Sequence, residues 1–142
     1  KKLLTKKKST KEYEKYGTLA ESLTHYLFTE MLIPSQRKII FKNVELDMII
    51  PNMAELQNDS HNIIIIFFVK TADKQQIKQR IQNMKKIQKD DSKIWVISKD
   101  SIDISQSTYI MERESFGKFL KDAQKFVEIK KMNKLNIFKT EI

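Results

Sequence analysis

The segment 39–70, IIFKNVELDMIIPNMAELQNDSHNIIIIFFVK, decides the fold class of this chain. Its second half contains an almost wholly apolar run, 63–69, which is typical of a strand buried on both faces. Its first half, 39–50, is predicted as one strand. Because side chains alternate between the faces of a strand, Glu45 and Asp47 are expected on the same face. Two carboxylates beside a buried strand indicate a candidate site for a divalent cation.

The apolar patterns outside this segment predict helices on either side of the strands. A helix over 17–31 has leucines at every fourth position, and this stripe is expected to face the core. Glu21 lies off the stripe, so the helical wheel favours its exposure to solvent. Further predicted elements are a helix over 73–89, a short strand over 93–98, an edge strand over 108–111, and a helix over 115–130 with Ser115 as its N-cap.

The predicted order of strands and helices indicates an α/β fold with a central mixed sheet flanked by helices on both faces. The chain divides into a basic N-terminal arm or helix over 1–16, a folded domain over 17–131, and a C-terminal tail over 132–142. The alternative for the segment 132–142 is an extra strand, from Leu135 to Phe138.

Composition favours an acidic partner. The chain has 142 residues, a net charge of +9 and no cysteine. The charge favours nucleic acid, with an anionic membrane surface as the alternative. The lack of cysteine excludes disulfides and thiolate metal sites, and no run is long enough to span a membrane. An intracellular location, cytoplasmic or nucleoid or nuclear, is expected. The residues expected to contact phosphates are basic: Arg37, Lys38, Lys74, Lys78, Arg80 and Lys85.

The αβββαβ order and three short motifs resemble the restriction-endonuclease-like fold, the PD-(D/E)XK nuclease superfamily. The nearest likeness is to archaeal Holliday junction resolvases. Glu21 in YGTLAESL resembles the family's helix glutamate, Asp47 in VELDMIIP its strand aspartate, and Lys70 in IIIIFFVKT its final lysine. The resemblance implies hydrolysis of duplex or branched DNA with Mg²⁺ or Mn²⁺, a role in DNA repair or recombination, and a homodimer or a partner subunit.

One position departs from the family pattern. The acid that precedes the lysine by two residues is replaced by Phe68, which cannot ligate a hard cation. Glu45 is the nearest substitute, and Asp73 and Glu21 are others. If the site is active, Asp47 is expected as the main metal ligand, with Glu21 and Glu45 as auxiliary ligands.

The sequence leaves three functional classes open. In an active nuclease, a bound metal would activate water and Lys70 would position it. The alternative is a catalytically inactive module of the same fold that binds DNA or a partner subunit. A third class is a domain of a larger complex with no role in nucleic-acid binding.

Overall fold

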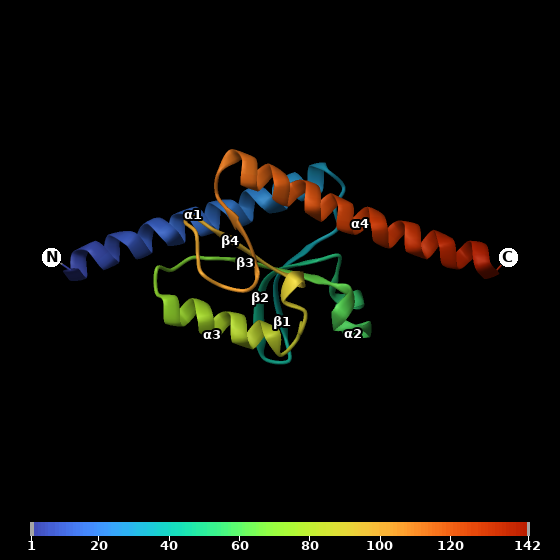
Figure 1. Ribbon diagram of the computed structural model, residues 1–142, viewed down its shortest axis with the longest axis horizontal. Helices are drawn as coiled ribbons and strands as arrows, with labels where there is room; N and C mark the ends of the chain where they lie inside the picture. The colour runs from blue at the N-terminus through green and yellow to red at the C-terminus, as the bar shows by residue number, and fades with distance from the viewer. Residues whose placement is uncertain (1, 142) are drawn as a thin grey trace.

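The computed structural model describes the backbone of residues 2–141, and the side chains of residues 11–112 and 114–133. The chain is an α/β domain with one mixed five-stranded sheet (Figure 1). Its main elements in chain order are α1 (Lys2–Glu30), β1 (Gln36–Phe41), β2 (Val44–Ile50), α2 (Met53–Asn58), β3 (Ile64–Phe68), α3 (Lys74–Lys85), β4 (Ile94–Ser98), β5 (Ser107–Ile110) and α4 (Arg113–Glu141).

The strands lie in the sheet in the order in which they follow one another in the chain, β1-β2-β3-β4-β5. The first three are antiparallel neighbours, and the last three are parallel neighbours. β3 is therefore the central strand, and every residue in it is buried, as its apolar run predicts. The prediction of an α/β fold with a mixed sheet is confirmed.

The predicted single strand over 39–50 is wrong, because it is two strands of a hairpin. Lys42 and Asn43 connect β1 to β2, and both have positive φ angles, 49° and 65°. This is the backbone of a two-residue hairpin turn of the type usually built with Asn-Gly or Asp-Gly. Asn tolerates this conformation well, but Lys42 gives no local signal for it. Residues 42 and 43 therefore do not clearly mark a turn within the segment 39–50.

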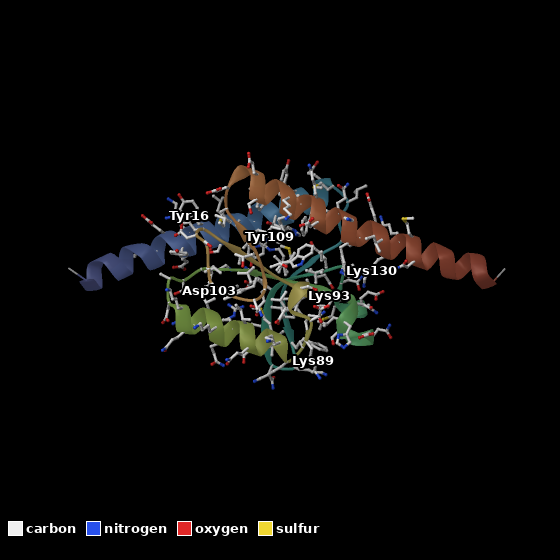
Figure 2. All side chains as sticks on the ribbon, in the orientation of Figure 1. Tyr16, Lys89, Lys93, Asp103, Tyr109 and Lys130 are labelled. Atoms are coloured by element: carbon white, nitrogen blue, oxygen red, sulfur yellow. The ribbon has the colours of Figure 1, made fainter. Side chains whose placement is uncertain are left out.

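Helices cover the sheet on both faces (Figure 1). On one face, α1 and α4 pack over a cluster that includes Phe28, Phe68 and Phe119. On the other face, α3 packs over a second cluster, to which it contributes Ile77 and Ile81. The first cluster includes Tyr109 of β5, which is labelled in Figure 2. Its hydroxyl donates to Asp122 on α4 at 2.7 Å.

The predicted buried face of α1 is wrong. Leu19 and Leu23 are 58% and 42% exposed, whereas Ala20, Thr24 and Phe28 are fully buried. Small side chains on the inner face let the helix axis lie close to the sheet. The apolar periodicity alone predicts that the outer face is buried, because leucines contribute more to an apolar stripe than Gly and Ala do.

Both chain ends are helical where the structure describes them. α1 runs without a break across the boundary placed at residue 16, so the basic arm is part of a helix. α4 continues to Glu141, so the alternative of a strand over 135–138 is wrong. Ser115 lies inside α4 instead of capping it, and its hydroxyl oxygen accepts from the Ile110 N–H at 3.0 Å.

Candidate functional site

The candidate site forms where β2 and β3 part. Pairing between these strands runs from Ile50↔Ile64 to Met48↔Ile66, and Asp47 is the next residue along β2. There the Oδ2 of Asp47 accepts from the backbone N–H of Phe68 at 3.0 Å. A side-chain carboxylate thus satisfies a buried donor just beyond the strand pairing. Asp47 is only 8% exposed, so its carboxylate depends on partners within the protein.

Arg80 is the second partner of Asp47. Its guanidinium lies 3.3 Å from Asp47 Oδ1 and 3.4 Å from the backbone oxygen of Glu45. The same group lies over the ring of Phe67, 5.0 Å from the ring centroid, in a cation–π contact. α3 therefore places a positive charge beside the part of β2 that extends beyond its pairing with β3, and both carboxylate oxygens of Asp47 have donors.

Glu21 lies between two cations from different strands. Arg37 on β1 donates to its Oε2 at 2.7 Å, and Lys70 beyond β3 donates to its Oε1 at 3.2 Å. The Glu21 residue is 2% exposed. Burial by itself would raise the pKa of this carboxyl, but the Arg37 hydrogen bond and the charge of Lys70 outweigh burial and hold the pKa below its usual value.

A close approach of α1 to the end of β3 makes the Glu21–Lys70 contact possible. A Cβ atom at Gly17 would lie 2.5 Å from the carbonyl oxygen of Val69 and 2.6 Å from Cγ of Lys70. Any larger residue would push the helix away from the strand. Gly17 is thus a structural requirement of the site that sequence reasoning missed. A glycine inside a helix is the signal that could have found it, because glycine weakens helices.

The structure brings together some of the predicted site residues and separates others. Glu21, Asp47 and Lys70 all lie around the end of β3, and Glu21 is buried instead of exposed. Glu45 is exposed, whereas Asp47, two residues further along β2, is buried. Asp73 accepts from the N–H groups of the first turn of α3, which makes it a helix cap.

Phe68, at the position where the PD-(D/E)XK pattern has an acid two residues before the lysine, faces the core. The Phe68 side chain is fully buried in the cluster beneath α1 and α4, while its N–H points to Asp47. An acid here would enter an apolar environment. Phe68 is therefore a packing residue on the first core cluster.

The residues present do not fit a divalent cation in this arrangement. Magnesium takes oxygen ligands, and the oxygens of Asp47 and Glu21 already accept from N–H groups or cations. Among the side chains that the structure describes, no three of His, Cys, Asp and Glu gather closely enough to hold a metal ion. The predicted ligand set of Asp47, Glu21 and Glu45 is not assembled.

The six basic residues predicted to contact phosphates fall into two groups. Three of them pair with carboxylates inside the domain, namely Arg37 with Glu21, Arg80 with Asp47, and Lys85 with Asp91. The other three are exposed, and they form no ion pair with a carboxylate in the described part of the chain: Lys38, Lys74 and Lys78. Sequence reasoning recognised Arg37 and Arg80 as cations but missed that they neutralise the buried acids.

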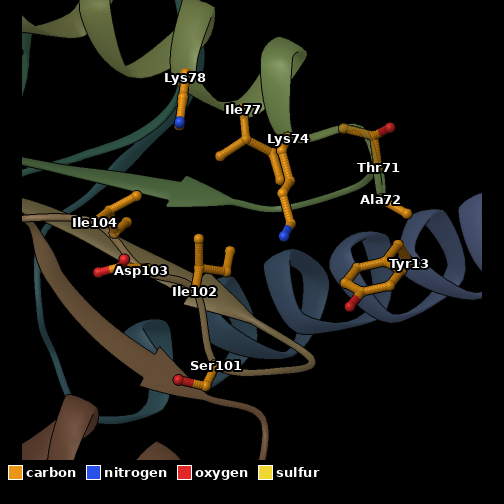
Figure 3. A pocket seen from close by; sticks show the side chains of 10 residues that line it. All are labelled: Tyr13, Thr71, Ala72, Lys74, Ile77, Lys78, Ser101, Ile102, Asp103 and Ile104. Atoms are coloured by element: carbon orange, nitrogen blue, oxygen red, sulfur yellow. The ribbon is translucent and has the colours of Figure 1, made fainter.

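Two cavities adjoin the candidate site on its α3 side. One of about 390 Å³ is lined by Lys70, Arg80 and the ring of Phe67. The other, of about 600 Å³, is lined by residues of α1, the start of α3 and the segment after β4 (Figure 3). Thr71 and Ile77 line both cavities. The surface beside the site is therefore concave and carries positive charge.

Comparison with known proteins found no relative of this chain. No family model matches the chain, and no curated protein or solved structure does. Within residues 2–141, none of the helices combines the length and the apolar character that crossing a membrane requires. The geometry of the site is therefore the basis for any functional conclusion.

Proposed function

We propose that this chain is a restriction-endonuclease-like domain that binds duplex or branched DNA through backbone phosphates, and that its former metal site has become a charge-compensated anchor. One observation supports this most strongly: Glu21, Asp47 and Lys70, from α1, β2 and the end of β3, lie around one end of the sheet. The order of elements supports it too, because α1, the strands β1 to β3, α3 and β4 give the order αβββαβ once the short helix α2 between β2 and β3 is set aside.

The cations of the site keep capacity for an anionic ligand. The side chains of Arg37, Lys70 and Arg80 are 27%, 32% and 35% exposed, although each of them pairs with a buried acid. An arginine has five N–H donors, and the acids use only part of them. A phosphate could therefore bind the outer N–H groups while the inner ones hold the site together.

The net charge of +9 supplies the long-range attraction for DNA. Lys74 and Lys78 continue the positive surface along α3 from the cavity that Lys70 and Arg80 line. Each phosphate that a lysine neutralises releases counterions, so binding is expected to weaken steeply with salt. This salt dependence separates the proposal from a domain of a larger complex whose contact with DNA is weak.

Metal-dependent hydrolysis of the phosphodiester bond is the second candidate function. The observation in its favour is that Asp47 and Lys70 flank the Phe68 position, where the resemblance implies a catalytic centre. In the arrangement described above, the carboxylate oxygens of Asp47 and Glu21 already accept from N–H groups or cations. The two candidate functions therefore differ in a single measurable property, which is the cleavage of DNA.

One experiment tests both candidates. Labelled four-way junction, linear duplex and single-stranded DNA are titrated with the protein over a range of salt concentrations, and the same mixtures are incubated with Mg²⁺, Mn²⁺ or a chelator. We expect tight, salt-sensitive binding without cutting. Metal-dependent cutting that Asp47→Ala abolishes would replace the proposal with the second candidate. Absence of binding at low salt to all three DNAs would remove both.

A further inference from the structure

The cavity of about 600 Å³ lies at the end of the two central parallel strands (Figure 3). The segment after β3 contributes Thr71 and Ala72, and the segment after β4 contributes Ser101 to Ile104. β3 and β4 are parallel, so both segments leave the sheet at the same edge. In open α/β sheets this edge is where small ligands bind. The volume lies in the range of ligand sites.

The walls of this cavity divide by chemistry. Ile77, Ile102 and Ile104 form an apolar side: Ile77 belongs to the second core cluster, and Ile102 and Ile104 pack against that cluster. Lys74 and Lys78 extend from α3 towards the cavity, as Figure 3 shows. Neither ammonium group has an ion-pair partner among the side chains that the structure describes. Among the side chains that the structure describes, Asp103 is the one acid in the lining.

An oriented aromatic ring completes the cavity. Tyr13 of α1 donates its hydroxyl hydrogen to Asp100 at 2.6 Å. This hydrogen bond, together with burial and the charge of Asp100, raises the pKa of Tyr13 to about 12, so the ring stays neutral. Lys99 lies 5.9 Å from the ring centroid. The ring is therefore held from its hydroxyl end, and it lines the cavity as an apolar wall.

We propose that this cavity binds one nucleotide, with its phosphate on Lys74 and Lys78 and its base against the isoleucines and Tyr13. Lysine ammonium groups bind phosphate as point charges, and flat rings are preferred surfaces for nucleobases. A free phosphate would use the lysines but leave the apolar wall empty. The nucleotide can be a free mononucleotide or an unpaired nucleotide of a DNA strand. Neither form depends on phosphate binding at Arg37 or Arg80.

The test measures binding of deoxyadenosine monophosphate to the full chain by calorimetry, with deoxyadenosine and inorganic phosphate as probes of the two halves. We expect the monophosphate to bind more tightly than either probe. K74Q combined with K78Q is expected to weaken it by at least about tenfold. Ala72→Trp is expected to weaken it by filling the cavity while keeping both charges.

Lys125→Gln, on the exposed side of α4, removes the same charge on the other face of the sheet and is expected to leave binding unchanged. The inference is overturned if inorganic phosphate binds as tightly as the monophosphate, or if K74Q with K78Q binds as well as the native chain.

A competition experiment identifies the source of the nucleotide. A duplex with one unpaired nucleotide and a fully paired duplex are each added to the monophosphate complex. Displacement by the first duplex alone would assign the cavity to a DNA strand, and displacement by neither would assign it to a free nucleotide. Monophosphate binding by a chain that binds no DNA would leave this inference standing while removing the proposed function.

Discussion

The guanidinium of Arg80 lies 3.3 Å from Oδ1 of Asp47, although the two residues are 33 positions apart in the chain. Asp47 belongs to β2 and Arg80 to α3, and the side chain of Asp47 is 11% exposed. A buried carboxylate is costly unless it is paired and hydrogen-bonded. Arg80 provides the charge, and the Phe68 N–H provides a further hydrogen bond. The pair and this hydrogen bond thus join β2, the end of β3 and α3.

Glu21→Gln is expected to change how stability depends on pH. The pKa of Glu21 is below its usual value, so the ionised form is favoured by folding. Its contribution is present above the unfolded pKa of about 4.3 and is lost as pH falls through the folded pKa. We expect the native chain to lose more stability than Glu21→Gln between pH 6 and pH 3, as measured by urea unfolding at each pH.

At pH 7 the Glu21→Gln variant is expected to be less stable than the native chain by about 1–2 kcal/mol, because Arg37 and Lys70 are partly exposed and water compensates them in part. Glu14→Gln, on the exposed side of the same helix, is the matched control. Parallel pH profiles for the native chain and Glu21→Gln would contradict the ion-pair account.

Alanine substitutions at the two glycines are expected to have opposite effects. At Gly17 a Cβ would meet the Val69 carbonyl oxygen, so Gly17→Ala should destabilise the fold by about 1–3 kcal/mol. At Gly117, within α4, a Cβ would meet nothing within 4 Å, so Gly117→Ala should stabilise the helix by about 0.5–1 kcal/mol. Thermal unfolding of both variants gives the comparison. Equal effects at the two positions would refute the close approach of α1.

Phe68→Glu is expected to unfold much of the protein instead of creating a metal site. The ring of Phe68 is fully buried, and an unpaired carboxylate in its place would lose packing as well as solvation. We expect destabilisation of more than about 3 kcal/mol, measured by denaturant unfolding. Phe68→Leu, which keeps the site apolar, is the control and should lose less. A stable Phe68→Glu protein that cuts DNA with Mg²⁺ would show that the side chain can turn to the site.

Two lysines on α3 allow a matched test of DNA binding. Lys78 has no ion pair with a described carboxylate, whereas Lys85 lies 3.4 Å from Asp91. Lys78→Gln is expected to reduce the slope of log affinity against log salt by about 0.9, and Lys85→Gln by less. Fluorescence anisotropy with one duplex at several salt concentrations measures both slopes. If Lys78→Gln leaves the slope unaltered, this face of α3 does not touch DNA.

The parts of the fold that follow from short-range patterns could be predicted from the sequence. The buried run of β3 is continuous and apolar, and α3 has both an apolar stripe and an N-cap at Asp73. Local sequence is enough to predict such elements, because a strand buried on both faces and a capped amphipathic helix each have a regular pattern of apolar residues.

The rest of the fold depends on contacts between distant segments. The buried side of α1 is set by Gly17 at the end of β3, which no periodicity within the helix reveals. The identities of Glu21, Asp47 and Lys70 could be proposed from motif order. Their partners, Arg37 and Arg80, could not, because each comes from a different element that only the folded sheet brings to the site.

The pairing in the sheet changes from antiparallel to parallel at β3. The two kinds of pairing differ in the length of the chain segment that connects the paired strands. β1 and β2 meet through a turn of two residues, while β3 and β4 meet only after α3 has crossed between them. Closing a short loop loses less chain entropy than closing a long one, so local pairings generally form faster. We therefore expect the β1–β2 hairpin to gain order early in folding, before the β3–β4 pairing. The site would then be completed late, when α3 brings Arg80 to an Asp47 already held on its strand.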